Sequence, residues 1–377
     1  MLALELLFWL ALGALVWTHL VYPLLVGALA RLRTRRVRTD DTLLPAVTVI
    51  VAAHNEETVI ERRIENLLAL DYPADRLRIV VASDASTDAT DSLVHRIAAT
   101  SPRVELLACP RGGKVAAQNR AVRAAGSEIL AFSDANATWA PDALRLLVRN
   151  FADPDVAYAC GQLRLQRPDG TNMEGAYWRY ELWLRAGESR LGSVTGGNGS
   201  IYAVRRSDYV EVDSRFGHDL SFPYLMVQRR RRAVYEPAAH AFEKPSTDTE
   251  EEYRRKIRMF EHCWLIVLRG KMLRRLPPLY WLAIVSHRHL RYASGLLHVV
   301  LLATSLALAS RGTVYLVVLT FQLLWLLAAL AGKLRLPVPG ASLALYYLLV
   351  SWATLVALRR YLSAGVPATW EKAEGTR

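Results

Sequence analysis

The hydrophobic positions of this chain form long unbroken blocks near both ends and short runs in the middle. The first block spans residues 6–29, and three more lie at 295–309, 313–331 and 341–358. Each block approaches the roughly 20 apolar residues that a membrane-spanning helix needs, and 295–309 is the shortest. The first block is too long for a signal-peptide core and lacks a basic segment before it, so we expect a retained anchor.

Between these blocks, short apolar runs alternate with helical patterns. Residues 57–70, for example, repeat their apolar side chains with the period of an amphipathic helix. Strands alternating with helices at this spacing predict an α/β fold with a parallel, doubly wound sheet. The predicted strands are 46–52, 77–83, 103–108, 128–133 and 155–163, and the helices between them are 57–70, 89–99, 114–125 and 142–151.

The pattern changes again after this alternating region. An aromatic, helical stretch follows residue 171, and residues 250–270 form a charged helix that becomes apolar near its end, as in helices that lie in a membrane interface. We therefore divide the chain into six parts. These are an anchor at 1–30, a basic linker at 31–45, an α/β domain at 46–250, interfacial amphipathic helices at 251–292, C-terminal transmembrane helices at 293–358, and a polar tail at 359–377.

The net charge of +12 is explained by the membrane. Basic residues cluster directly after the first apolar block, at 31–38, and directly before the second, at 269–291. Positive charge beside membrane helices marks the cytoplasmic side and attracts anionic lipid. We therefore expect a multi-pass protein of the cell membrane with a cytoplasmic α/β domain, and no nucleic-acid partner.

Two arrangements of the C-terminal helices are compatible with the sequence. Three separate blocks favour three crossings, which would leave the C-terminus outside the cell, and Lys333 and Arg335 agree with this. Arg359 and Arg360 disagree, because positive charge directly after the last block favours a cytoplasmic C-terminus. If the short block 295–309 is interfacial or re-entrant, the C-terminus returns to the cytoplasm.

Polar side chains follow three of the predicted strands at the point where each strand ends. Asn55 and Glu56 follow the first, Asp84 ends the second, and Asp134-Ala135-Asn136 follows the strand at 128–133. Ligands of open α/β sheets bind at the carboxyl ends of the strands. An acid beside a second oxygen ligand holds a hard divalent cation, which usually carries phosphates. These residues predict a metal-dependent enzyme that uses a nucleotide.

Each of these residues also has a structural interpretation. Asp and Asn favour turns, so Asp134 and Asn136 are also compatible with a simple strand-to-loop turn. Lys114, after Gly112-Gly113, offers a point charge to a nucleotide or is a solvated side chain at a helix start. Helix capping explains Ser86 and Asp88 but leaves Asp84 unexplained.

The second half of the chain adds candidates for catalysis. Asp219 is a candidate general base or a helix cap, and His218 is a base, a ligand or a structural residue. Arg255 and Arg258 lie on one face of a helix, where they could clamp a diphosphate. The run at 228–232 is more consistent with a solvated face or turn.

In this order, these motifs resemble family 2 glycosyltransferases of the GT-A fold. They are most similar to the membrane-embedded branch with cellulose, chitin, hyaluronan and poly-N-acetylglucosamine synthases. The resemblance covers roughly residues 45–295. It implies an α/β GT-A fold, a Rossmann-like mixed sheet that binds nucleotide-diphosphate sugars, with transmembrane helices at both ends. The sequence departs from the family at Asn136, where a second acid is usual, at His218, which replaces an acid, and at Met259, which replaces a Trp of the processive synthases.

The resemblance also implies roles for particular residues. Asp134 and Asn136 would bind Mg²⁺ or Mn²⁺ on the donor, and Asp219 would be the catalytic base. The remaining expected positions are Ala53, Asn55, Glu56, Asp84, Lys114 and Asp134 on the nucleotide-sugar side, and Gly197, Asn198, His218, Arg255 and Arg258 on the acceptor and diphosphate side.

We therefore expect an inverting, metal-dependent hexosyltransferase that moves a sugar from a nucleotide diphosphate, with UDP the expected nucleotide. The acceptor would be a hydroxyl of a lipid-linked or growing glycan at the membrane, as in polysaccharide biosynthesis. Three alternatives stay open: a processive synthase with a translocation channel, a nucleotidyltransferase with a similar α/β core, and a membrane scaffold that binds nucleotide without catalysis.

Overall fold

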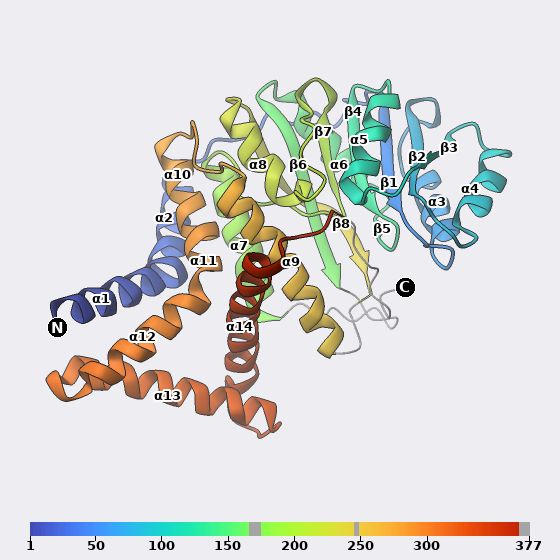
Figure 1. Ribbon diagram of the computed structural model, residues 1–377. Helices are drawn as coiled ribbons and strands as arrows, with labels where there is room; N and C mark the ends of the chain where they lie inside the picture. Colours follow the sequence, from blue (N-terminus) through green and yellow to red (C-terminus); the bar gives the residue numbers. More distant parts are fainter. Residues whose placement is uncertain (166–174, 245–248, 369–377) are drawn as a thin grey trace.

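The computed structural model describes residues 1–165, 175–244 and 249–368, and across these residues eight strands form one sheet (Figure 1). The strand order is β3-β2-β1-β4-β7-β6-β8-β5. The strands are β1 Val47–Ala53, β2 Leu77–Asp84, β3 Val104–Cys109, β4 Ile129–Asp134, β5 Thr138–Trp139, β6 Val156–Leu165, β7 Tyr202–Arg205 and β8 Arg232–Glu243.

The first four long strands are parallel, as the sequence predicts. β1 pairs with β2 on one side and β4 on the other, and β3 extends the sheet beyond β2. All seven residues of β1 are buried, because helices cover both faces of the sheet. The five strands predicted from the sequence correspond to β1, β2, β3, β4 and β6 within one or two residues at most ends. The carboxyl ends of β1, β2 and β4 therefore meet at one edge.

The rest of the sheet is mixed. β7 runs antiparallel to both β4 and β6, and β5 runs antiparallel to β8. The sequence pattern did not predict β5, β7 or β8, and it assigned 228–232 to a solvated face or turn. Arg232 instead begins β8 and is only 3% exposed, because it pairs with Asp153 and donates to backbone carbonyls.

Helices cover the two faces of the sheet with separate apolar clusters. On one face α3 and α4 cover the β1–β3 half of the sheet and α6 covers β6 and β8, and on the other face α5 and α8 pack against Phe132 and Tyr202. α7 carries the aromatic stretch noted in the sequence. The bounds are α3 Ile60–Leu68, α4 Thr90–Ala98, α5 Lys114–Ala124, α6 Ala143–Val148, α7 Ala176–Leu191 and α8 His218–Gln228.

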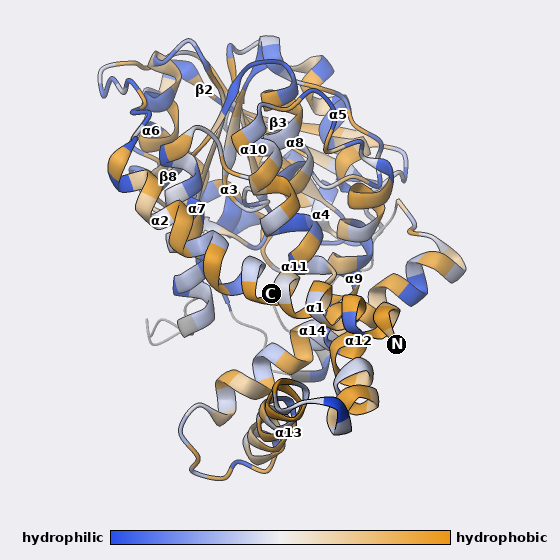
Figure 2. Cartoon of the chain, turned by 90° about the vertical axis from the view of Figure 1, so that its left-hand side faces the viewer, coloured by the Kyte–Doolittle hydropathy of each residue, from blue (hydrophilic) through white to orange (hydrophobic). Residues whose placement is uncertain are grey.

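Within the described part of the chain, four helical stretches are long and apolar enough to cross a membrane: 2–32, 294–311, 313–333 and 341–364. Figure 2 shows hydrophobic residues concentrated on α1, α12 and α13, away from the sheet. The helices at the two ends are α1 Leu2–Val16, α2 Tyr22–Leu32, α9 Thr249–Arg269, α10 Pro278–Ile284, α11 Leu290–Tyr292, α12 Ser294–Leu308, α13 Thr313–Lys333 and α14 Ala341–Ala364.

The N-terminal anchor is attached tightly to the α/β domain. A π-helical turn at Trp17–Val21 separates α1 from α2, and the chain bends between them (Figure 1). α2 then packs along α7 through small residues. A Cβ on Gly27 would lie 2.7 Å from the Trp183 ring, and one on Gly187 would lie 2.7 Å from Val26. Glycine at both positions thus allows the close approach, and a larger residue would displace the neighbouring side chain.

The end of α14 lies against the α/β side of the molecule. Tyr361 and Val366 belong to the same buried cluster as Tyr224 of α8 and Phe260 of α9, and Arg360 lies 3.8 Å from Glu261. α13 joins the ends of α12 and α14 that point away from the sheet (Figure 1). The structure thus brings the end of α14 back to the side of the α/β domain, and the number of membrane crossings made by α12, α13 and α14 stays a prediction.

Candidate active site

Two loops at the carboxyl edge of β1 and β2 hold each other in place. Asn55 adopts a left-handed conformation, with φ 56°, which Asn tolerates better than most residues. Its side-chain oxygen accepts from the Thr87 N–H at 2.7 Å, and the Glu56 N–H donates to the Thr90 hydroxyl at 2.8 Å. Ala53 ends β1 beneath these contacts. The expected nucleotide-side positions on β1 therefore lie together with the loop after β2.

Asp84 organises the loop before α5. Its carboxylate is fully buried, accepts hydrogen bonds from the backbone N–H groups of Gly112 at 2.7 Å and Gly113 at 3.0 Å, and forms an ion pair with Arg111. Asp84 therefore supports the glycine turn that starts α5. A direct contact between this carboxylate and a nucleotide would require Arg111 to move aside.

Lys114 and Asp134 form an ion pair at the centre of this edge. Lys114 is the first residue of α5, and Asp134 is the last residue of β4. Burial alone would lower the pKa of Lys114, but the charge and hydrogen bond of Asp134 raise it above its ordinary value. The ammonium group is therefore charged and bound to the carboxylate that the sequence assigned to a cation.

A second carboxylate, not found from the sequence, lies beside Asp134. The Ser200 hydroxyl contacts Asp134 Oδ2 at 3.2 Å and also hydrogen-bonds to Glu243 at the end of β8. Burial and the negative charge of Asp134 raise the pKa of Glu243. Ser200 follows the glycine-rich loop, and Glu243 ends a strand that the sequence pattern did not predict. The segment before Glu243 shows no regular alternation of apolar and polar residues, so the sequence pattern did not identify this acid.

A buried arginine lies behind these acids. Arg63 of α3 is 2% exposed, donates to the Ser133 hydroxyl at 2.7 Å and stacks on Trp139. Burial lowers its pKa to about 9, and the charges of Asp134 and Glu243 act in the opposite direction. The sequence gave no sign that this helical residue faces the site.

The loop at 196–199 approaches the site closely because it contains glycine. A Cβ on Gly197 would lie 1.8 Å from the Tyr158 hydroxyl, and one on Gly196 would lie 2.4 Å from the Arg288 guanidinium. Asn198 is 9% exposed, and its side-chain oxygen accepts from the Ser200 N–H at 3.0 Å. The loop is connected to Asp134 through Ser200, and the acceptor-side roles of Gly197 and Asn198 stay predictions.

Asp219 is joined to this loop through its backbone. The Gly197 N–H donates to the Asp219 carbonyl at 2.6 Å, while the Asp219 side chain is exposed in the first turn of α8. Its negative charge contributes to raising the pKa of Lys114, after that of Asp134. Asp219 therefore faces the same site with an exposed carboxylate.

His218 belongs to the core instead. Its ring is 4% exposed, lies 2.7 Å from the Tyr202 hydroxyl and stacks on Phe222 at 4.2 Å. Burial, with the nearby charge of Lys114, lowers its pKa to about 3, so it is neutral at physiological pH. The structural interpretation accounts for His218, and we do not include it among acceptor contacts.

Arg255 and Arg258 act on different acids. Burial raises the pKa of Glu243, and the positive charge of Arg255 acts to lower it. Burial likewise raises the pKa of Glu261, and the charge of Arg258 acts to lower it. Arg255 is thus close enough to the oxygen cluster for its charge to act there, and Arg258 acts on Glu261, which lies 3.8 Å from Arg360. The shared diphosphate clamp by Arg255 and Arg258 stays a prediction.

A buried polar cluster supports the loop from the membrane side. Glu188 is 3% exposed and accepts from the Tyr22 hydroxyl at 2.7 Å and from the Thr195 hydroxyl at 2.9 Å. His287 bridges Glu188 and Glu181, and Arg288 donates to Thr195 at 3.0 Å. Residues of α2, α7 and the segment after α10 therefore meet directly behind Gly196.

The donor set at the edge suits a hard divalent cation. Asp134, Ser200 and Glu243 present only oxygen atoms, and half-buried Asn136 lies two residues beyond Asp134. The ammonium of Lys114 already marks a position where positive charge is stable. No group of three or more His, Cys, Asp or Glu residues suited to a metal occurs in the described residues, so phosphate oxygens or water would complete the coordination.

Comparison with known families gives one match. The family model described as glycosyl transferase family 2 matches residues 48–212. An N-acetylglucosaminyltransferase of Bradyrhizobium elkanii is 34% identical over 125 residues, which cover 32% of this chain and 68% of that protein. The beta-monoglucosyldiacylglycerol synthase of Synechocystis sp. is 31% identical over 163 residues, 42% of this chain and 33% of that enzyme. The chain spans a third to a half of the length of several such relatives.

One solved structure is similar along nearly the whole chain. The mannosyltransferase PcManGT from Pyrobaculum calidifontis, in complex with GDP-Man and Mn²⁺, aligns with a TM-score of 0.72 and 26% sequence identity. The alignment covers 96% of this chain and 98% of that one, so it includes the helices at both ends. The similarity agrees with the GT-A fold expected from the sequence.

Proposed function

Because the chain belongs to glycosyl transferase family 2 and is a glycosyltransferase, we propose that it transfers a hexosyl group from a nucleotide-diphosphate sugar to a lipid-associated hydroxyl at the membrane. The oxygen cluster of Asp134, Ser200 and Glu243 at the carboxyl edge of the sheet carries the proposal. It faces the cation Lys114 on one side and the loop with Asp219 on the other.

The donor diphosphate would bind through this cluster. Asp134 and Asn136, with Glu243 beside them, would hold Mg²⁺ or Mn²⁺. When bound, the cation supplies positive charge that stabilises the leaving diphosphate. Lys114 would exchange its contact with Asp134 for the phosphates, and Arg255 adds a further positive charge at the same edge. That the solved mannosyltransferase was in complex with GDP-Man and Mn²⁺ supports this arrangement.

The acceptor side is the loop 196–199 with Asp219. The exposed carboxylate of Asp219 would take the proton of the acceptor hydroxyl as its oxygen attacks the anomeric carbon. Attack from the face opposite the diphosphate gives inversion. The hydrogen bond from the Gly197 N–H to the Asp219 carbonyl would fix the position of the base relative to the bound donor.

The position of this loop supports a lipid-associated acceptor. Arg288, on the segment that leads into α12, packs on Gly196, and α14 ends against α9. The name of the Synechocystis relative describes a synthase of a glucosyl lipid, which supports a lipid as the acceptor class. We further propose that the α/β domain is cytoplasmic, because the basic segment 31–38 follows the first apolar stretch.

A single transfer is favoured over processive synthesis. Met259 stands where the processive enzymes carry a Trp platform, and its side chain is 49% exposed. A product ladder of increasing length would contradict single transfer.

The proposal is tested with the detergent-purified full chain and a panel of UDP- and GDP-sugars, with native lipid extract as the acceptor. Formation of a radiolabelled glycolipid from one donor, abolished by EDTA and restored by Mn²⁺ or Mg²⁺, is expected. Binding of nucleotide without turnover of any donor would support the scaffold alternative, and nucleotidyl transfer to a sugar phosphate would support the nucleotidyltransferase.

A further inference from the structure

A pocket of about 540 Å³ lies away from the donor site, between α2, α10 and the start of β8. β8 begins at Arg232, which lines this pocket, and ends at Glu243 in the oxygen cluster. The strand is twelve residues long, so its two ends lie roughly 35 Å apart. The pocket is therefore distinct from the site described above.

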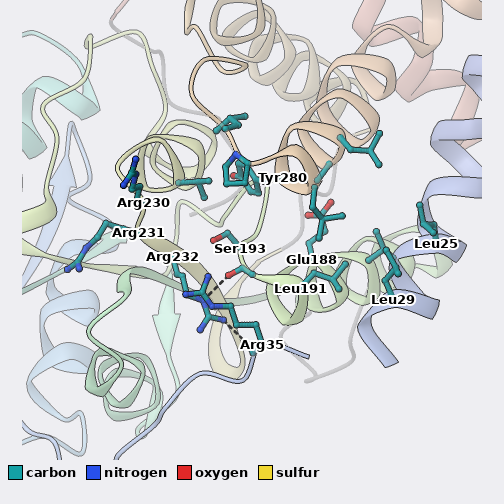
Figure 3. Close-up of a pocket in the computed structure, with 18 of the residues that line it drawn as sticks. Leu25, Leu29, Arg35, Glu188, Leu191, Ser193, Arg230, Arg231, Arg232 and Tyr280 are labelled. Atoms are coloured by element: carbon teal, nitrogen blue, oxygen red, sulfur yellow. Dashed lines mark hydrogen bonds between the residues drawn. The ribbon is translucent and has the colours of Figure 1, made fainter. Parts of the chain in front are cut away.

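One end of the pocket is strongly basic. Arg35, Arg230, Arg231, Arg232 and Arg275 all line it, and Glu188 is the acidic residue of the lining. The carboxylate of Glu188 is already engaged by Tyr22, Thr195 and His287. Figure 3 shows Arg35, Arg230, Arg231 and Arg232 gathered on one side of the pocket.

Two of these arginines have no carboxylate partner among the residues that the structure describes. Arg35, Arg231 and Arg232 are paired with Asp155, Asp208 and Asp153, none of which lines the pocket. Arg230 and Arg275 are exposed and have no such pair. Both adopt left-handed conformations, with φ 63° and 52°, at the turn after α8 and the turn before α10. The basic end therefore has uncompensated positive charge.

The other end of the pocket is apolar. Leu25 and Leu29 of α2 lie opposite the arginines in Figure 3, and Leu279 and Leu282 of α10 complete this wall. Ser193 and Tyr280 lie between the two ends. An occupant must be anionic at one end and hydrocarbon at the other.

The position of α2 places this pocket at the depth of lipid headgroups. The stretch 2–32 contains 31 residues, about 46 Å of helix, against a hydrocarbon core of about 30 Å. With α1 in the hydrocarbon, α2 lies in the headgroup region. Leu25 and Leu29 come six and two residues before the basic segment that starts at Arg31, where a bilayer changes from apolar to charged.

We propose that this pocket binds an anionic membrane phospholipid, with its phosphate against Arg230 and Arg275 and an acyl chain along α2 and α10. A pocket of this volume is within the range of small-molecule sites. The arginines that already pair with aspartates stay in those ion pairs. Arg230 and Arg275 supply charge-assisted hydrogen bonds to the phosphate. A free phosphate shares the charge but gains nothing from the leucine wall.

The test is native mass spectrometry of the detergent-purified full chain titrated with phosphatidylglycerol, phosphatidylcholine or inorganic phosphate. Phosphatidylglycerol is expected to bind more tightly than phosphatidylcholine, and inorganic phosphate is expected to bind weakly. The double variant Arg230→Gln/Arg275→Gln should weaken phosphatidylglycerol binding by roughly tenfold to a hundredfold, since it removes two charge-assisted contacts.

The matched control is Arg62→Gln/Arg78→Gln, which removes two exposed arginines on α3 and β2. It should change the affinity by less than about twofold, because distant surface charges are screened. Equal loss in both double variants, or no loss in the first, would overturn the proposal. Inorganic phosphate binding as tightly as phosphatidylglycerol would identify a free-anion site instead.

A variant of the apolar wall separates the two ligand sources. Leu29→Gln should weaken phosphatidylglycerol binding and leave inorganic phosphate binding unchanged. If both change together, or neither changes, the leucine wall does not contact a lipid. Donor turnover of every variant checks that the α/β domain is intact.

Discussion

The ammonium of Lys114 binds the carboxylate of Asp134 across the carboxyl edge of the sheet. One residue starts a helix and the other ends a strand, so the pair fixes the spacing between the glycine turn and the oxygen cluster. In the proposed function, donor phosphates replace Asp134 as the partner of Lys114, and a divalent cation replaces Lys114 as the partner of Asp134.

Asp134→Ala should lower turnover by about a hundredfold or more, the usual loss when electrostatic stabilisation of a leaving group is removed. It should also abolish Mn²⁺ binding followed by electron paramagnetic resonance. Asp75→Ala is the control, because its side chain is 81% exposed on a distant turn. Full activity of the parent in EDTA, with bound metal shown to be absent, would contradict the metal requirement.

Asp219→Asn should bind the donor almost normally and lose about 10²–10⁴-fold in transfer, the range for a general base. Titration calorimetry with a non-hydrolysable donor and a turnover assay separate the two effects. Asp213→Asn, in the same segment and paired with Arg215, should leave both unchanged. Parallel loss of donor affinity and rate would indicate a structural role for Asp219.

His218 should make the protein less stable in mild acid. Its pKa in the folded chain is about 3, against an ordinary value of 6.5, because burial disfavours the charged ring. The unfolded chain therefore binds the proton more readily, so this stability is complete above pH 6.5 and is lost as the pH falls toward 3. The slope for one such group is at most about 1.4 kcal/mol per pH unit.

Denaturant unfolding between pH 4 and 7 measures this effect. His218→Gln keeps a hydrogen-bonding side chain but does not titrate, so its stability should depend less on pH than that of the parent. The same slope in both proteins would mean that another group is responsible.

Tyr22→Phe should lower stability by about 1.5–3 kcal/mol, the range for a hydrogen bond to a charged group, because Glu188 loses a donor inside the protein. Thermal unfolding in detergent measures the change. Tyr315→Phe also removes one tyrosine hydroxyl from an apolar helix and is the control. A loss as large in Tyr315→Phe would show that the effect is not specific to Glu188.

The C-terminus should lie on the same side of the membrane as the α/β domain. With the three native cysteines replaced, Ser363→Cys at the end of α14 should react with a membrane-impermeant thiol reagent only after permeabilisation. Ser310→Cys, between α12 and α13, should react in intact cells. Labelling of Ser363→Cys in intact cells would support the three-crossing arrangement.

Local patterns predicted the parallel strands because each strand has its own apolar run and its own polar end. Asp84, Lys114 and Asp134 were identified because parallel strands bring their carboxyl ends to one edge. Glu243 and Ser200 were not, since they reach that edge through strands without a clear sequence pattern: β8, which pairs in parallel with β6, and β7, which pairs antiparallel with β4. Arg232 was assigned to a solvated face, because a run of arginines does not indicate which one is buried in an ion pair. The direction of α14 also depends on tertiary packing that hydropathy does not encode.

The glycine contacts between α2 and α7 limit how this enzyme can be rebuilt. Gly27 and Gly187 let the two helices approach so closely that the N-terminal segment shares a surface with the catalytic half. A generic hydrophobic tail would carry the protein to the membrane but could not fill that surface. Another membrane anchor could thus not replace the N-terminal segment. A version truncated after residue 32 would lose the buried contacts between α2 and α7.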